Sequence, residues 1–372
     1  MSSDLYRRLQ EHLDRMPVPF PATASGIEIR ILQRLFTPEE AEAALALSMI
    51  PEPLTTIRKR VPEWTLDRLT SVLDSMAEKG LIERSSSRGE KRYGKSALAI
   101  GIYERQLTRL TAELQQDVET YFEEGFGAAF QSSTPRQIRT VPVNVAIVPN
   151  RTVGSYDDIR SYVAKTSGPF AVMDCICRHG RDLLGQPCQQ TKLRQTCLTF
   201  GPVAKGMVDS GAAHYIEREE TLEVLTAADR EGLVLEPQNT SEPLFICCCC
   251  GCCCGVLRSA KVLPQPAAFF KSTYHAESDA GLCAACANCE SRCQMEAVHL
   301  TDGLAAVDIS RCIGCGLCVT SCSTGAMHLV ANATSAEPPK GMPALYLRMY
   351  RDRFGTYETA KALGKSIVGR QV

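Results

Sequence analysis

The chain has 372 residues, of which 44% are hydrophobic and 22% charged, as expected for a folded globular protein with two or three domains. A net charge of −1 gives the molecule no overall field for nucleic acid or a membrane surface. The uncharged and strongly apolar run at residues 243–257 has about 15 residues and is too short to span a bilayer. The charged N-terminal segment has no apolar core, so we expect a cytoplasmic protein.

Residues 1–100 are predicted to form short helices followed by a hairpin. Thr37 is a candidate N-cap, a second helix begins near Thr55, and a third runs from Thr65 to a C-cap at Gly80. This order of helices and hairpin resembles a winged-helix domain. The resemblance implies a surface for DNA or for protein.

Residues 101–270 are predicted to mix helices and strands. Hydrophobic spacing favours a long helix over residues 103–130, and a second helix is expected at 211–231. Apolar runs indicate strands at 141–148, 170–177 and 233–235. The sequence therefore predicts a mixed α/β middle domain.

Eleven of the 19 cysteines lie in this middle domain, and seven of them are packed into residues 247–254. Adjacent cysteines on a strand point to opposite faces, so one face cannot present the whole run to one centre. Either a turn at Gly251 refolds the run, or its thiols serve different centres. We predict at least one further iron–sulfur cluster here, with ligands drawn from Cys177, Cys188, Cys197, Cys247, Cys249, Cys250, Cys252, Cys253 and Cys254.

The alternatives for these cysteines are a zinc site or small buried hydrophobic residues, the latter fitting Cys175 and Cys248. Basic side chains also gather near Cys177, among them Arg178, Arg181 and Arg194. Such cations would offset the negative charge of a thiolate-bound cluster.

Residues 271–332 carry two runs with the spacing C-x2-C-x2-C-x3-C, and the second repeats the first at an offset of 29 residues. Three thiolates of each run wrap one [4Fe–4S] cluster, and the fourth reaches the other cluster. One predicted ligand set is Cys283, Cys286, Cys289 and Cys322, and the other is Cys312, Cys315, Cys318 and Cys293. A zinc site or disulfides fit this spacing less well.

These runs resemble the bacterial two-[4Fe–4S] ferredoxin domain over roughly residues 274–330. That family usually has a proline after the fourth cysteine of each run, and Gln294 and Ser323 stand there instead. The complete chain resembles a class of 4Fe–4S binding proteins from anaerobes. The resemblance depends on the winged-helix-like start, the segment from Cys175 to Arg178, the polycysteine run and the ferredoxin module, and it implies an anaerobic setting.

The expected architecture is a multidomain α+β protein with four parts: a winged-helix-like domain (1–100), a cysteine-rich domain with an additional cluster (101–270), a two-[4Fe–4S] domain (271–332), and a linker with a C-terminal helix (333–372). We expect an electron carrier or oxidoreductase subunit, with two [4Fe–4S] clusters and at least one more, rather than a stand-alone enzyme. The chain has no G-x-G-x-x-G and no G-x-S-x-G motif, so no catalytic residue is assigned and flavin or nucleotide is expected from a partner.

Two other functions stay open. One is a redox-sensing DNA-binding regulator, since residues 58–95 hold ten basic and six acidic residues. The other is an oxidoreductase subunit with a catalytic cluster on the polycysteine run. We favour redox partner proteins, a flavoprotein or a reductase, over DNA, and expect no insertion into a membrane.

Overall fold

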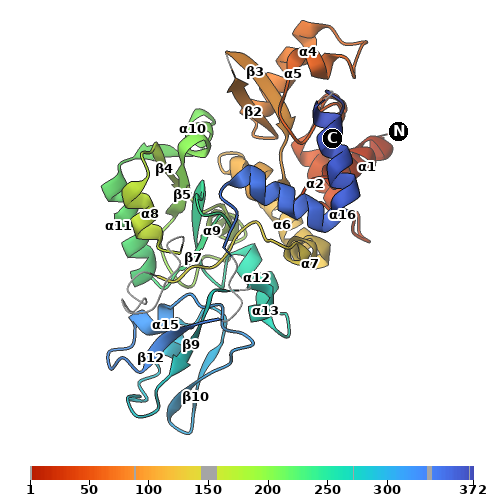
Figure 1. Ribbon diagram of the computed structural model, residues 1–372. Helices are drawn as coiled ribbons and strands as arrows, with labels where there is room; N and C mark the ends of the chain where they lie inside the picture. The colour runs from red at the N-terminus through yellow and green to blue at the C-terminus, as the bar shows by residue number, and fades with distance from the viewer. Residues whose placement is uncertain (1, 88, 144–156, 271, 333–336, 368) are drawn as a thin grey trace. The chain divides into compact units, whose positions relative to one another are not determined.

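The computed structural model describes residues 2–87, 89–143, 157–270, 272–332, 337–367 and 369–372. The chain forms two compact units (Figure 1). The first unit consists of Met1–Pro135 and Tyr346–Val372, and the second consists of Arg136–Leu345. Both contain helices and strands, so this is a mixed α/β protein. The predicted division into four parts stays a prediction.

The first unit is mainly helical and carries one small sheet. Its elements are α1 (Ser2–Leu13), α2 (Ile27–Leu35), α3 (Pro38–Leu45), β1 (Glu52–Pro53), α4 (Leu54–Arg58), α5 (Leu66–Glu78), β2 (Ile82–Ser87), β3 (Glu90–Lys95), the short turns η1 (Leu98–Ile102), η2 (Glu104–Gln106) and η3 (Phe122–Phe126), α6 (Ala112–Tyr121), α7 (Gly127–Ser132) and most of α16 (Met342–Ile367).

The predicted helix starts of this unit are confirmed. The Thr37 side chain accepts a hydrogen bond from the Glu40 N–H, and the Glu40 carboxylate accepts one from the Thr37 N–H, which forms a capping box. Thr65 caps α5, and Gly80 follows that helix with φ +72°. Strands β2 and β3 form the hairpin, and β1 pairs with β3 on its other edge.

The helix predicted over residues 103–130 is wrong at its start. Helix α6 begins at Ala112, because the Thr111 side chain accepts a hydrogen bond from the Leu114 N–H and caps a new helix there. The C-terminal helix is present as α16, with a break at Gly355. Arg353 holds it against its own unit through a 2.6 Å ion pair with Asp14.

Residues 89–96, GEKRYGKS, match the pattern of a phosphate-binding loop. That motif works as a loop between a strand and a helix, whereas here the segment forms strand β3. Its Lys95 is buried at 3% exposure, and its Nζ donates a hydrogen bond to the His12 carbonyl at 3.2 Å. This segment therefore does not form a phosphate-binding loop.

Lys95 should make the stability of the first unit depend on pH. Burial, followed by repulsion from Arg15, lowers the pKa of Lys95 to about 7, whereas an unfolded lysine titrates near 10.4. Between these values the unfolded chain binds the extra proton. The free energy of unfolding should therefore rise with pH in this window, by at most about 1.4 kcal/mol per pH unit. Substituting Lys95→Met should remove that rise.

Trp64 is the sole tryptophan of the chain and is 3% exposed within the first unit, so its fluorescence reports this unit in melts of the full protein. Melts between pH 7 and pH 9.5 should show a slope for wild type and for Lys91→Met, because Lys91 is exposed on the same strand. An unchanged slope in Lys95→Met would contradict the assignment.

The second unit combines a five-stranded sheet with two small sheets. Its elements are α8 (Ile159–Lys165), β4 (Phe170–Asp174), α9 (Ile176–Leu183), β5 (Gln195–Phe200), α10 (Gly201–Asp209), β6 (His214–Ile216), α11 (Arg218–Arg230), β7 (Val234–Pro237), β8 (Phe245–Cys249), α12 (Gly255–Lys261), α13 (Pro266–Phe270), β9 (Tyr274–Ser278), α14 (Asn288–Arg292), β10 (Val298–Thr301), β11 (Leu304–Val307), α15 (Leu317–Thr320) and β12 (Met327–Ala331).

The five-stranded sheet has the order β6-β4-β5-β8-β7, and all its pairs are antiparallel. Helices α8 and α11 pack together beside it (Figure 1). The strand predicted over 170–177 ends at Asp174 because α9 begins directly afterwards, and the helix predicted over 211–231 begins only at Arg218 because β6 precedes it. Of the strand predicted over 141–148, Val141 bridges to Leu235, and residues 144–148 lie outside the described residues.

The two small sheets are β9 with β12 and β10 with β11. They belong to the same compact unit as the five-stranded sheet. The Val143 N–H donates to the Cys315 carbonyl at 3.0 Å, and the Arg292 guanidinium donates to the Asp229 and Arg230 carbonyls, each at 2.7 Å. The C-terminal cysteine runs are thus hydrogen-bonded to the end of α11 and to the segment that contains Val143, in the same compact unit.

Candidate metal centres

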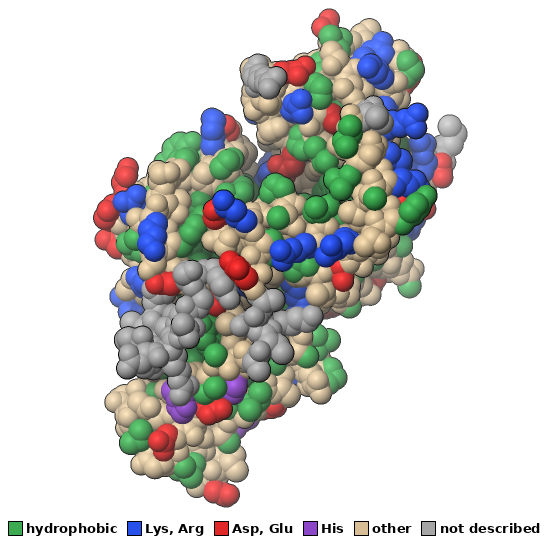
Figure 2. Space-filling model, in the orientation of Figure 1, with side chains coloured by type: hydrophobic (Ala, Val, Ile, Leu, Met, Phe, Trp, Pro, Cys, Tyr) green, Lys and Arg blue, Asp and Glu red, His purple; other side chains and the backbone are tan. Residues whose placement is uncertain are grey.

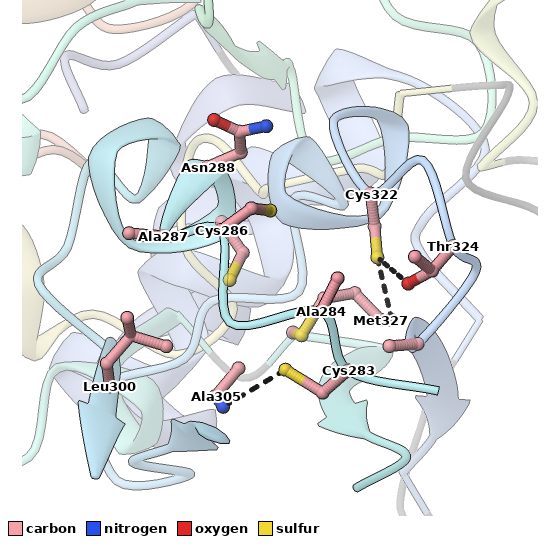
Figure 3. Close-up of a pocket in the computed structure, with 12 residues that line it drawn as sticks. Cys283, Ala284, Cys286, Ala287, Asn288, Leu300, Ala305, Cys322, Thr324 and Met327 are labelled. Atoms are coloured by element: carbon pink, nitrogen blue, oxygen red, sulfur yellow. Dashed lines mark hydrogen bonds between the residues drawn. The ribbon is translucent and has the colours of Figure 1, made fainter. Parts of the chain in front are cut away.

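The structure brings four cysteines of the predicted first set to one pocket (Figure 3). Cys283 and Cys286 come from the loop after β9, Cys289 from α14, and Cys322 from the turn after α15. The pocket has a volume of about 320 Å³, its mouth included. A crossover between the two runs is therefore present in the fold, because Cys322 lies with the thiols of the other run.

The predicted second set is also gathered. Burial, followed by the charges of neighbouring thiols, raises the pKa of Cys318 well above its ordinary value. Those neighbours are Cys315, Cys312, Cys293 and Cys289. Three of them complete the second set, and Cys289 belongs to the first. The two sets are therefore close enough for their charges to interact.

Backbone N–H groups point at sulfur atoms of both sets. Ala305 donates to Cys283 Sγ at 3.5 Å, and Met327 donates to Cys322 Sγ at 3.4 Å (Figure 3). In the second set, the Ala276 N–H reaches Cys312 Sγ at 3.3 Å and the Ala297 N–H reaches Cys293 Sγ at 3.2 Å. Such donors stabilise thiolates and tune the potential of a cluster, so the cradle fits thiolate-bound iron.

The 29-residue repeat of the sequence is a repeat of the backbone as well. Strand β9 corresponds to β11, helix α14 to α15, and β10 to β12. Three left-handed positions of the first half recur as glycines in the second: Ala285 and Gly314 (φ +54° and +67°), Ala287 and Gly316 (+60° and +76°), and Glu296 and Gly325 (+54° and +73°). The two halves are thus the same loop built twice.

In the middle of the chain, the polycysteine run is divided between two groups of thiols. Both possibilities left open by the sequence occur: β8 ends at Cys249, and a turn at residues 251–253 refolds the remainder. The first group is Cys188, Cys250, Cys252 and Cys253, whose Sγ atoms all lie within 4.8 Å of one another. Cys248 faces the hydrophobic core at 2% exposure and belongs to neither group.

The second group contains a carboxylate. Glu236, Cys249 and Cys254 place one ligand atom each within 4.8 Å of the others. The Cys177 thiol, followed by Cys249, lowers the pKa of Cys254 to about 6. Cys197 and then Cys249 hold the pKa of Cys247 well below its ordinary value. This network gathers the rest of the nine cysteines predicted for the middle domain.

Glu236 is a candidate ligand that the sequence reasoning missed. Burial, followed by the charge of Cys247, raises the pKa of Glu236 to about 8. A fully buried carboxylate is costly unless it is protonated, paired or bound to a metal. The available signal was an acid within the otherwise apolar segment from Leu233 to Pro237.

Arg178 lies between the two groups with 0% exposure. Its guanidinium donates to Thr196 Oγ1 and to the Cys248 carbonyl. Burial opposes its charge, but the thiols of Cys175 and Cys250 raise the pKa of Arg178 above its ordinary value. Among the described residues no carboxylate pairs with it, so the thiolates supply the negative charge that a buried cation needs.

Comparison with known proteins agrees with part of this site. Residues 304–327 match a family model described as a 4Fe–4S binding domain, and this segment contains Cys312, Cys315, Cys318 and Cys322. No curated protein and no solved structure shows a significant match to the chain. The chain therefore carries an iron–sulfur domain, and its cysteine groups indicate an electron-transfer or redox function. No helix within the described residues is long and apolar enough to cross a membrane.

Proposed function

We propose that this protein transfers single electrons through two ferredoxin-type [4Fe–4S] clusters and at least one further centre in the cysteine-rich domain. The observation that carries this proposal is the doubled loop, with its exchanged fourth cysteine and its N–H donors to sulfur. When bound, clusters of this type accept and release one electron at a time. The chain's own part is to hold them close together, orient N–H groups toward sulfur and restrict water.

Exposure supports a direction for the transfer. Cys286 of the first set is exposed, and Leu282 beside that loop is 52% exposed. In the second set Cys318 is buried and the others are only partly exposed. We propose that a redox partner protein, a flavoprotein or reductase, docks beside the first set. Electrons then pass inward through the second set toward the cysteine-rich sheet.

The first unit supports a winged-helix-like assignment through its order α3-β1-α4-α5-β2-β3 and its three-stranded sheet. A regulator would direct the basic hairpin toward phosphate. Here Arg84 and Lys91 both pair with Asp74 of α5, at 3.5 and 2.7 Å. Lys and Arg side chains are also interspersed with Asp and Glu on the face in Figure 2. We therefore propose that this domain binds another protein. We also propose a reducing, anaerobic cytoplasm as the setting of the whole chain.

The test is anaerobic purification or reconstitution, followed by assays of iron and acid-labile sulfide and by paramagnetic resonance of the reduced protein. We expect at least about eight irons per chain and the broadened spectrum of two interacting paramagnets. A flavoprotein reductase should reduce the protein in a salt-sensitive reaction. Colourless protein without iron would reject the proposal. Salt-sensitive, sequence-selective binding of DNA fragments would favour the regulator instead.

A further inference from the structure

The Sγ atoms of Cys188, Cys250, Cys252 and Cys253 all lie within 4.8 Å of one another. Cys188 Sγ lies 3.6 Å from Cys250 Sγ and 3.6 Å from Cys252 Sγ. Cys252 Sγ lies 3.7 Å from Cys253 Sγ. In a tetrahedral site with metal–sulfur bonds of about 2.3 Å, neighbouring sulfurs are separated by about 3.8 Å. The observed spacing is that of four ligands around one ion.

A cubane places different demands on its thiolates. Each thiolate binds a different iron, so the iron–sulfide cube lies between the sulfurs and separates them. The thiols of the first set line an open pocket. Sulfur atoms within 4.8 Å of one another leave no space for the cube. The same fold therefore contains two kinds of cysteine group.

We propose that Cys188, Cys250, Cys252 and Cys253 bind one thiophilic divalent ion, zinc or ferrous iron, as a closed tetrathiolate centre. The proposal does not depend on the ferredoxin-type clusters. Four cysteine ligands leave no open position, which is typical of structural rather than catalytic sites. The buried Arg178 beside Cys250 offsets part of the excess negative charge of four thiolates around a divalent ion.

The position of this centre gives it a function. Gly251, between two of the ligands, donates its N–H to Gln294 Oε1 at 2.8 Å. Gln294 in turn donates through Nε2 to Gln190 Oε1 at 2.9 Å, and Gln190 lies two residues after Cys188. Gln294 directly follows Cys293 and occupies the position where the resembling ferredoxin family usually has proline. The ion thus joins the loop of Gln190 to the loop of Gly251. Both loops hydrogen-bond to Gln294, the residue next to the proposed cluster ligand Cys293.

The test compares metals with acid-labile sulfide in protein purified anaerobically. A cubane contributes equal amounts of iron and sulfide, whereas a single ion contributes metal alone. Wild type should contain about one zinc per chain, or about one iron in excess of sulfide. Either result supports the proposal. Iron fully matched by sulfide, with no zinc, overturns it.

Variants locate the ion. Cys252→Ala should lose about one metal ion per chain and keep its sulfide, whereas Cys248→Ala should lose neither, because Cys248 faces the core within the same run. Loss of about four irons with about four sulfides in Cys252→Ala would show a cubane and overturn the proposal. If that variant does not fold, spectroscopy of wild type decides: X-ray absorption at the zinc edge if the extra metal is zinc, and Mössbauer spectroscopy if it is iron, because an iron edge averages over the iron of the proposed clusters. Four sulfurs at about 2.3 Å from zinc without a metal neighbour, or a high-spin ferrous signal separate from that of the clusters, support the single ion, and the absence of both rejects it.

Discussion

Replacing Cys322 with alanine should remove the cluster of the loop that begins at Cys283, and should spare the cluster of the loop that begins at Cys312. The reason is the exchanged fourth ligand: Cys322 lines the same pocket as Cys283, Cys286 and Cys289. We expect a loss of about four irons and about four sulfides per chain. The interaction between two paramagnets should also disappear from the reduced spectrum.

Double variants identify which cluster is lost. If Cys283 and Cys322 serve one cluster, Cys283→Ala with Cys322→Ala should lose no more iron than either single variant, because the cluster can be lost only once. Cys312→Ala with Cys322→Ala should lose about eight irons, because two clusters are affected. If Cys322 instead served the cluster of Cys312, the double variant with Cys283→Ala should lose about eight irons and the double variant with Cys312→Ala about four.

Cys293→Ala is the matched partner of this experiment, since residues 293 and 322 are equivalent in the 29-residue repeat. It should remove the cluster of the more buried second set. Cys248→Ala controls for the general loss of a cysteine, because this side chain lies in the hydrophobic core. A loss of iron from Cys248→Ala would mean that folding, rather than ligation, determines the iron content.

The gathering of the two C-terminal cysteine runs was predictable because its information is local and doubled. The spacing of eight cysteines assigns two ligand sets before any tertiary contact is known. The 29-residue offset also predicted equivalent loops, which the backbone angles at Ala285 and Gly314 now match. The helix starts of the first unit were likewise readable, because caps such as Thr37 and Thr65 signal helix starts within a few residues.

The cysteine-rich half could not be resolved from sequence, because its grouping depends on contacts between distant segments. Cys188 meets Cys250 across 62 residues, and Gln294 meets Gly251 across 43. The alternation of side chains along a strand predicts that neighbouring residues of β8 face opposite sides of the sheet. It does not predict where the turn after Cys250 places the thiols that follow. Glu236 became a candidate ligand because it lies opposite Cys247 on the neighbouring strand, and the sequence alone does not give this pairing.

Substituting Gly314→Ala should abolish the second cluster, although the change adds a single methyl group. Gly314 has φ +67°, where a side chain costs roughly 1–2 kcal/mol. An added Cβ would also collide with the Tyr274 carbonyl oxygen and with Ser272 Oγ. The Tyr274 backbone is part of β9, so the collision cannot be relieved by rotating a side chain. The loop with Cys312 and Cys315 must shift instead, and its N–H···S geometry changes with it.

The repeat supplies the control for this substitution at the equivalent position 285, where alanine already occupies φ +54°. Ala285→Gly should keep both clusters and change stability by less than about 1 kcal/mol, because relief of left-handed strain is offset by the greater freedom of glycine in the unfolded chain.

Iron and sulfide assays and thermal loss of cluster absorbance measure both variants. Gly314→Ala should lose about four irons with its sulfide. If it keeps full iron content and the wild-type melting temperature, the close packing of this loop against β9 does not control cluster binding. Alanine at position 314 would then be tolerated as well as alanine at position 285. The difference between the two halves of the repeat would have no effect on the second cluster.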